Sequence, residues 1–189
     1  DIKPRERGKS ERIIEEFMLL ANEAAAALGR KLELPFVYRV HEPPFPEKAE
    51  NLQEILRLLG LPVPTFQTEV QPGQLAAVLE NAKGTKYDAL INTYVLRSMA
   101  KAKYSEQPLG HFGLVLQDYA HFTSPIRRYP DLAIHRILSD LVTGMPAVKI
   151  QKKYYKFAPS AAQQSTRTEL RAMQAERECE DCYKAEFMT

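Results

Sequence analysis

The residues best suited to chemistry lie in one short stretch, HFTSPIRRYPD, at positions 121–131. Two adjacent arginines, Arg127 and Arg128, stand there between two prolines. Pro130 disfavours helical geometry at the residue before it, so we expect a rigid turn over SPIRRY and a helix from Pro130 onward. The arginines would then precede a helix N-terminus, where free N–H groups and the helix dipole favour an anion. Because guanidinium groups bind phosphate oxygens through paired hydrogen bonds, the stretch predicts a phosphate-binding turn.

A purely structural alternative exists for the same two arginines. One of them could pair with Asp131, one turn into the helix, and the other could be an ordinary surface side chain. For two arginines in an arbitrary setting this is the usual outcome. A proline-fixed turn favours the functional interpretation, because binding groups work best when their supporting backbone is already rigid.

The charge of the chain is unevenly distributed along its 189 residues. Residues 94–157 contain ten Lys and Arg against four Asp and Glu, a net charge of +6, whereas the whole chain carries only +2. A basic central segment indicates a surface for a polyanion, or else a solvated basic face. Cys179 and Cys182 are the only cysteines, which favours a reducing compartment, here the cytoplasm, over a disulfide scaffold. No run of eighteen apolar residues is present, so we expect no membrane contact.

Helical periodicity dominates the elements that must position these residues, and it predicts an α+β, helix-rich fold with few strands. We expect helices at 10–29, 46–60, 72–83, 88–103, 130–144 and 160–187. Strands are expected at 36–40 and at 111–123, the latter buried, and 152–157 is expected to be a basic, aromatic connector. The inner faces of two of these helices can be listed: Ala49, Leu52, Ile55, Leu56 and Leu59 in one, and Leu90, Ile91, Tyr94, Val95 and Met99 in another.

The segment HFGLVLQDYAHFTSPIRRYPDLAIH, residues 111–135, closely resembles the signature of the ribonuclease II and ribonuclease R family of exoribonucleases, in their RNB catalytic domain. Four further segments resemble the family in the same order. They are IIEEFMLLAN (13–22), YRVHEPP (38–44), LRSM (96–99) and AERECEDCYKAEFM (175–188). The resemblance covers essentially the whole chain, and its central signature is highly specific.

The resemblance implies that residues 1–189 are the C-terminal portion of an RNB catalytic domain, without its upstream half and the flanking OB-fold domains. It also implies processive 3′-to-5′ hydrolysis of single-stranded RNA to 5′-nucleoside monophosphates with Mg²⁺. Arg127 matches the family's catalytic arginine, which contacts the scissile phosphate. Glu16 and Glu176 align with glutamates that line the RNA channel, where they could accept hydrogen bonds from ribose hydroxyls.

Two further RNA contacts are expected from the residues of the turn itself. Arg128 belongs to the predicted phosphate-binding turn. Tyr129 is an aromatic side chain that could stack on a base. Several other aromatics share that possibility, but most such residues form core, so we expect no more than one or two of this set to contact RNA: Tyr119, Phe122, Tyr129, Tyr154 and Tyr155.

The metal site is where the chain departs from the family. The family's metal ligands are a cluster of aspartates in the first half of the catalytic domain. This chain has six aspartates, and no two of them lie within eight residues of each other. Two-metal phosphoryl chemistry needs closely placed carboxylates. We therefore expect no metal ligands here, Mg²⁺ bound by the upstream half, and no activity from this chain alone.

Other possible ligands are assigned ordinary roles. The CEDC motif at 179–182 lies in a predicted helix without a second pair or a nearby histidine, so its cysteines are expected to be ordinary helical residues and not zinc or redox groups. Packing or capping is expected for His111, His121 and His135. Three functions therefore remain: half of an active exoribonuclease, a non-catalytic RNA-binding relative lacking the metal site, or a scaffold without RNA affinity.

Overall fold

The computed structural model describes residues 8–66 and 70–188. They belong to two compact units, each made of segments that are not continuous in the sequence. The first unit contains the chain up to Arg39, residues 103–108 and the chain from Asp118 onward. The second contains Val40–Ala102 and Leu109–Gln117.

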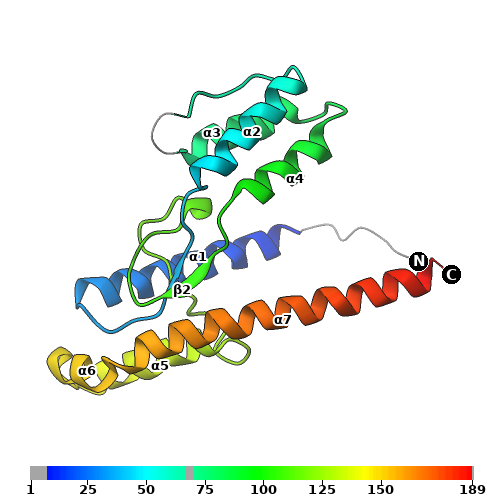
Figure 1. Cartoon of the computed structure of the whole chain (residues 1–189). Coiled ribbons are helices and arrows are strands. Elements are labelled where there is room, and N and C mark those ends of the chain that lie inside the picture. The colour runs from blue at the N-terminus through cyan, green and yellow to red at the C-terminus, as the bar shows by residue number, and fades with distance from the viewer. Residues whose placement is uncertain (1–7, 67–69, 189) are drawn as a thin grey trace. The chain divides into compact units, whose positions relative to one another are not determined.

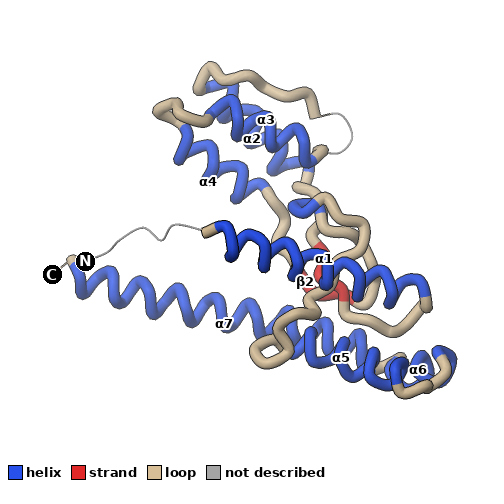
Figure 2. The backbone as a smooth tube through the Cα atoms, turned by 180° about the vertical axis from the view of Figure 1, so that it is seen from behind, coloured by secondary structure: helices blue, strands red, loops and turns tan. Residues whose placement is uncertain are grey.

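Helices dominate the first unit (Figure 1). They are α1 (Lys9–Lys31), α5 (Tyr129–Val142), α6 (Ala147–Tyr154) and α7 (Phe157–Phe187). A two-stranded sheet pairs β1 (Tyr38–Val40) with β2 (Lys103–Ser105), shown in red in Figure 2. Helix α7 packs against β2, α5 and α6. Fully buried side chains of this unit include Phe36, Val37, Ile134, Ile137 and Ile150. The predicted helix-rich α+β class is confirmed.

Gly29 has a packing role that differs from the predicted one. The sequence pattern ends the first helix at Gly29, but α1 continues to Lys31. A Cβ atom at Gly29 would lie 2.8 Å from the ring of Phe36, closer than non-bonded carbons can approach. Gly29 therefore lets the Phe36 ring pack directly on the helix backbone, and Phe36 is completely buried.

The second unit is a small helical core. It consists of α2 (Pro46–Leu58), α3 (Pro72–Ala82), α4 (Asp88–Ser98) and the 3₁₀ turn η1 (Phe112–Leu114). Helix α4 packs on both α2 and α3. The predicted inner face of α2 is confirmed, since Ala49, Leu52 and Leu56 are buried and its other two members are partly buried. Pro46 and Pro72 each start their helix, as expected from their fixed φ and missing N–H.

Two predictions for α4 are wrong: the position of its C-terminus and the burial of one residue on its inner face. The helix ends at Ser98, and residues 103–105 form β2 instead of its last turn. Ile91 and Val95 are buried as predicted, but Leu90 is 43% exposed.

The predicted buried strand at 111–123 is wrong. Positive φ angles at Gly110 and Val115 turn the chain back on itself, so that His111 pairs with Leu116 across a short loop containing η1. Residues 117–123 belong to no helix or strand. The backbone groups of this segment find their partners in its own turns, in the main chain of Arg39 and His41, and in side chains.

The predicted connector at 152–157 is also wrong, because residues as far as Tyr154 belong to α6. Ile150 and Tyr154, one helical turn apart, are both buried. Three lysines of α6 lie at helical spacing away from these two residues: Lys149, Lys152 and Lys153. The last helix starts at Phe157, three residues before its predicted start.

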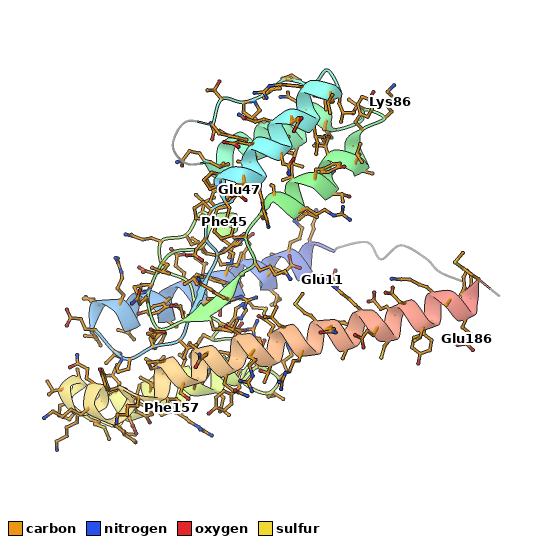
Figure 3. All side chains as sticks on the ribbon, in the orientation of Figure 1. Glu11, Phe45, Glu47, Lys86, Phe157 and Glu186 are labelled. Carbon is orange, nitrogen blue, oxygen red and sulfur yellow. The ribbon has the colours of Figure 1, made fainter. Side chains whose placement is uncertain are left out.

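Two helices of the first unit, α1 and α7, have extensive solvent-exposed surfaces. On α1, Ile13, Ile14, Phe17 and Leu20 are each more than half exposed. Side chains follow α7 from Phe157 to Glu186 (Figure 3), and all of those from residue 171 to 188 are exposed. Over the described ranges 8–66 and 70–188, no helix combines the length and apolarity needed to cross a bilayer.

Candidate functional site

The arginine turn is closed by hydrogen bonds from both of its ends. The carbonyl of Ser124 accepts the backbone hydrogens of Arg127 (3.3 Å) and Arg128 (3.1 Å). The backbone N–H of Ser124 donates to Oδ1 of Asp131 at 2.7 Å. Helix α5 begins at Tyr129, one residue before the predicted start, with Arg128 as its N-cap and Pro130 in its first turn. The segment is thus a fixed turn that leads directly into a helix.

Arg128 is engaged inside this turn. Its Nη2 atom donates to Oδ1 of Asp131 at 2.8 Å, and the arginine side chain is only 19% exposed. Asp131 is completely buried. A buried carboxylate is tolerated only when a cation and hydrogen-bond donors compensate it, and Arg128 and Ser124 supply both. The structural alternative therefore applies to Arg128, whose role as an RNA contact stays a prediction.

Arg127 lies on the outside of the same turn. It is exposed, and within the part of the chain that the structure describes its guanidinium has no hydrogen bond or ion pair. Its neighbours Ile126 and Tyr129 are also solvent-exposed, Ile126 completely and Tyr129 by 47%. The tip of the turn thus presents one unpaired cation, one apolar side chain and one aromatic ring. A guanidinium with all its donors available can bind a phosphate group through two hydrogen bonds.

The segment before the turn is held by a residue that the sequence pattern did not reveal. Asn22 of α1 is 3% exposed. Its Oδ1 accepts the backbone hydrogens of Phe122 (2.9 Å) and Thr123 (3.2 Å), and its Nδ2 donates to Oη of Tyr119 at 3.1 Å. The sequence does contain an indication of this role, because Asn22 is the polar member of a buried helical stripe whose other members are Ala25, Ala26 and Gly29.

The three histidines have packing and capping roles, as predicted. His111 accepts the backbone hydrogen of Leu114 at the start of η1. His135 of α5 donates from Nε2 to the carbonyl of Phe122 at 2.9 Å and stacks on the Phe122 ring. His121 hydrogen-bonds through Nδ1 to Oη of Tyr104 at 2.9 Å.

Tyr104 belongs to a polar cluster behind this segment. Burial raises the pKa of Tyr104 to about 12, an effect that the nearby Arg39 guanidinium partly opposes. Arg39 lies over the Tyr104 ring at 4.6 Å and pairs with Glu169 of α7 at 2.7 Å. The phenol is therefore neutral at physiological pH, and it ties His121 to β2.

The two candidate glutamates lie on different helices. Glu16 is an exposed residue of α1, and Glu176 is an exposed residue in the second half of α7. Among the described residues no hydrogen bond or ion pair joins either of them to Arg127. Both carboxylates are accessible to a ligand, and their roles stay predictions.

The candidate aromatics separate clearly by exposure. Tyr119 and Tyr154 are buried, and Phe122 is half-buried under His135. Tyr129 and Tyr155 are exposed, by 47% and 71%. These last two are the members of the candidate set whose rings are open enough to stack on a base.

The described residues do not fit a metal site. No group of three His, Cys, Asp or Glu side chains among them could hold a metal ion. The five described aspartates all have partners within the chain: Asp118 pairs with Arg30 at 2.9 Å, Asp131 with Arg128, Asp140 with Lys153 at 2.6 Å and Asp181 with Lys184, and Asp88 accepts a hydrogen bond from Asn92. The hydrogen bond from Lys153 lowers the pKa of Asp140. Cys179 and Cys182 are exposed thiols.

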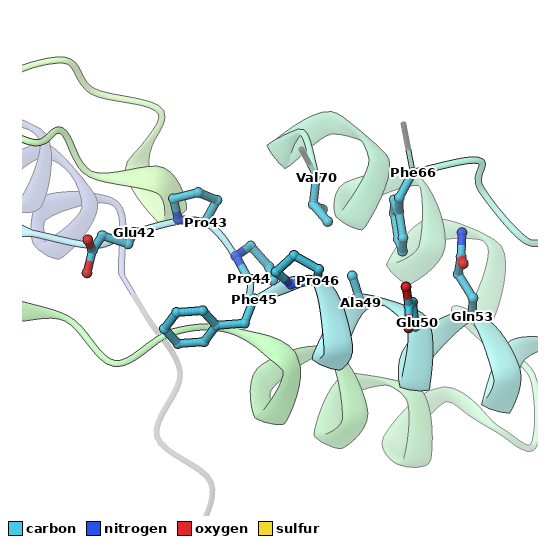
Figure 4. A pocket seen from close by; sticks show the side chains of 10 residues that line it. All are labelled: Glu42, Pro43, Pro44, Phe45, Pro46, Ala49, Glu50, Gln53, Phe66 and Val70. Atoms are coloured by element: carbon cyan, nitrogen blue, oxygen red, sulfur yellow. The ribbon is translucent and has the colours of Figure 1, made fainter. Parts of the chain in front are cut away.

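A separate cavity lies in the second unit (Figure 4). Its volume is 420 Å³, and it contains none of the candidate residues. Pro44, Pro46 and Ala49 lie on one side of it, and Phe66 and Val70 lie on the other. The lining also includes the carboxylates of Glu42 and Glu50 and contains no lysine or arginine, so the cavity does not suit a phosphate group.

Comparison with known proteins identifies similar chains. Residues 1–144 match the family described as RNB domain. Ribonuclease R 1 of Lactococcus lactis is 40% identical over 188 residues, which are 100% of this chain and 23% of that protein. The chain therefore spans about a quarter of the length of this curated relative.

Two solved structures show the same fold. The structure of Mycoplasma genitalium RNase R in complex with ribose methylated single-stranded RNA has a TM-score of 0.81 and 32% identity. The match covers 94% of this chain and 28% of that one. The structure of yeast Ssd1, described as a pseudonuclease, has a TM-score of 0.59 and 25% identity. That match covers 85% of this chain and 21% of Ssd1.

Proposed function

Because the chain belongs to the RNB domain family, we propose that it is the C-terminal part of the catalytic domain of a 3′-to-5′ exoribonuclease. The substrate is single-stranded RNA, and the products are 5′-nucleoside monophosphates. This part of the enzyme supplies the arginine turn and one side of the RNA channel. Two exposed, unpaired thiols agree with a cytoplasmic enzyme.

The observation that carries the proposal is the difference between the two arginines. Arg128 and Asp131 fix the turn from inside, and this leaves the Arg127 guanidinium exposed and without a partner among the described side chains. In the proposed role, Arg127 binds the scissile phosphate and stabilises negative charge that develops on its oxygens. Tyr129 and the exposed carboxylates of Glu16 and Glu176 are proposed to contact the bases and ribose hydroxyls of the bound strand.

The metal ligands are proposed to lie in the upstream half of the domain. Mg²⁺ would neutralise charge on the reacting phosphate and activate the attacking water. The described residues offer no carboxylate cluster for it, so this chain contributes to the reaction through Arg127. The exposed apolar residues of α1, Ile13, Ile14, Phe17 and Leu20, suit a surface that packs against that upstream half.

A second candidate function is RNA binding without cleavage. It is favoured by the described residues' lack of a metal-binding group and by the fold shared with the pseudonuclease Ssd1. In that case Arg127 would hold a phosphate of the RNA without taking part in its hydrolysis. Phosphate contacts of this kind weaken as the salt concentration rises.

The two functions are separated by assaying the full-length protein that contains this chain. Single-stranded RNA labelled at its 5′ end is incubated with the protein and Mg²⁺, and the labelled products are sized over time. The exoribonuclease proposal expects the labelled strand to shorten from its 3′ end, and a parallel assay with RNA labelled throughout its length should show labelled mononucleotides. Salt-sensitive binding without shortening would support the non-catalytic relative. If the protein neither binds nor cleaves RNA at low salt, only a scaffold role remains.

A further inference from the structure

Asn22 is a buried polar residue in the middle of α1, where asparagine does not favour the helix. Asparagine forms helices less readily than alanine, because its side chain competes for backbone hydrogen bonds. Here the side chain bonds to residues about a hundred positions later in the chain, and its amide oxygen and nitrogen both have partners. Asn22 lowers the intrinsic stability of α1, so its contribution to the structure must come from these hydrogen bonds.

The bonds of Asn22 replace those that a neighbouring strand would provide. Residues 117–123 form no helix or strand, so their backbone groups need other partners. The Asn22 Oδ1 atom takes two consecutive backbone hydrogens, those of Phe122 and Thr123. His135 of α5 holds the carbonyl of Phe122 from the other side. Two helices of the same unit therefore fix this one residue of the loop.

The fixed loop is continuous with the arginine turn. Thr123 is followed by Ser124, whose N–H is bound by Asp131 and whose carbonyl accepts from Arg127 and Arg128. Every residue from 122 to 124 thus has its backbone hydrogen bound by a side chain of α1 or α5. Arg127 is only four residues from the last bond to Asn22. The position of its backbone depends on that bond as well as on Asp131.

We propose that Asn22 is a positioning residue for Arg127, an inference that rests on the proposed function of this turn. A transition-state contact has to be held to within about 0.5 Å, which requires a rigid supporting shell. A misplacement of about 1 Å lowers a rate by about 100-fold. Asn22 supplies rigidity at the entrance to the turn, and Asp131 supplies it at the exit.

The test uses Asn22→Ala and Asn22→Asp in the full-length protein. Alanine removes all three hydrogen bonds, whereas aspartate keeps an acceptor for the hydrogens of Phe122 and Thr123. Asn92→Ala is the matched control, because Asn92 is an exposed helical asparagine whose amide nitrogen, among the described residues, bonds only to Asp88 of its own helix. We expect Asn22→Ala to lower kcat on single-stranded RNA by 10- to 100-fold with less than a threefold change in KM. Asn22→Asp should recover most of that loss, and the control should match wild type.

A double variant distinguishes positioning from a general loss of structure. If Asn22 acts through Arg127, adding Asn22→Ala to Arg127→Ala should cause little further loss. Independent, multiplicative losses in the double variant would overturn the proposal, as would an unchanged kcat in Asn22→Ala. Amide hydrogen exchange gives a readout without catalysis. Exchange at residues 122–128 should accelerate in Asn22→Ala while exchange in the first half of α7 stays as in wild type.

Failure of the proposed function would look different from failure of this inference. A wild-type protein that binds RNA but never shortens it would refute the exoribonuclease proposal. The same set of variants is then measured on the RNA Kd. In that case Asn22→Ala should raise the Kd for RNA when Arg127 is present. It should leave the Kd unchanged when it is added to Arg127→Ala. Equal Kd values and equal exchange rates in wild type and Asn22→Ala would refute the positioning role in either case. If the alanine variant does not fold, Asn22→Leu takes its place, because leucine resembles asparagine in shape and forms none of the three hydrogen bonds.

Discussion

The Nη2 atom of Arg128 lies 2.8 Å from Oδ1 of Asp131, and the same oxygen accepts the backbone hydrogen of Ser124 at 2.7 Å. Two neighbouring arginines therefore have different surroundings. Arg128 is three residues before Asp131 and faces it across the first turn of α5, as side chains at this spacing do. Arg127 takes no part in that pair and is exposed. The buried ion pair holds the backbone from which Arg127 extends.

Replacing Arg127 tests the proposed catalytic contact. Arg127→Ala should lower kcat on single-stranded RNA by about 10²- to 10³-fold, the usual loss when one transition-state donor is removed. Arg127→Lys should recover only part of it, since an ammonium cannot form the paired hydrogen bonds of a guanidinium. The free energy of unfolding should change by less than about 0.5 kcal/mol, because the side chain is exposed. Arg57→Ala, at an exposed arginine of α2, is the control. Intact turnover in Arg127→Ala would refute the assignment.

Replacing Asp131 should act mainly on stability. Asp131→Ala leaves Arg128 and the Ser124 N–H without their buried partner, so we expect a loss of about 3–5 kcal/mol in the free energy of unfolding. Urea titration followed by circular dichroism measures it. The Arg128→Ala, Asp131→Ala double variant should lose less than the sum of the single losses, because each single variant leaves one charge unpaired. Additive losses would show that the pair is not coupled.

Gly29 offers a test of packing. Gly29→Ala places a methyl group 2.8 Å from the ring atoms of Phe36, and we expect it to destabilise the protein by about 1–3 kcal/mol through overpacking. Gly73→Ala in α3 is the matched control, because a Cβ atom there has no neighbour within 4 Å. Helix propensity should leave that variant unchanged or more stable. Equal thermal unfolding midpoints for the two variants would contradict the close packing of Gly29 on Phe36.

Alkaline pH should destabilise the first unit through Tyr104. Burial raises the pKa of Tyr104 from 10.0 to about 12, so the native state holds this proton more tightly than the unfolded chain does. The resulting stabilisation is complete below pH 10 and is lost as the pH rises toward 12, by about 2 kcal/mol. Urea unfolding between pH 9 and 11.5 measures the slope. Tyr104→Phe should reduce this slope by about half, because burial also raises the pKa of Tyr38 in the same unit to about 12. Tyr155→Phe, at an exposed tyrosine, should leave the slope as in wild type. An unaltered slope in Tyr104→Phe would contradict the prediction.

The two exposed glutamates should affect the choice between RNA and DNA. If Glu16 and Glu176 accept hydrogen bonds from ribose hydroxyls, their alanine variants should lose affinity for RNA by about tenfold each, the value of one such bond. Their affinity for a DNA strand of the same sequence should not fall. Competition binding with RNA and DNA oligonucleotides measures the ratio. Glu54→Ala, at an exposed glutamate of α2, is the control. Equal losses for both nucleic acids would assign these side chains a role other than recognition of the ribose.

The sequence alone determined the features that depend on neighbouring residues. Pro46, Pro72 and Pro130 mark helix starts within one residue of the observed ones, because the effect of proline on its own φ and on the preceding residue is local. The inner face of α2 followed from helical periodicity for the same reason. The arginine turn and the family resemblance were also visible in one continuous stretch of sequence.

Only the tertiary structure decided the features that depend on residues far apart in the chain. Side chains from other elements decide which arginine is free and why residues 117–123 form no strand. These side chains are Asn22 from α1, and Asp131 and His135 from α5. The role of Gly29 likewise depended on Phe36, whose ring leaves no room for a Cβ atom at that position of the helix. Periodicity records which residues are apolar, but it does not record which distant group will satisfy a backbone hydrogen bond.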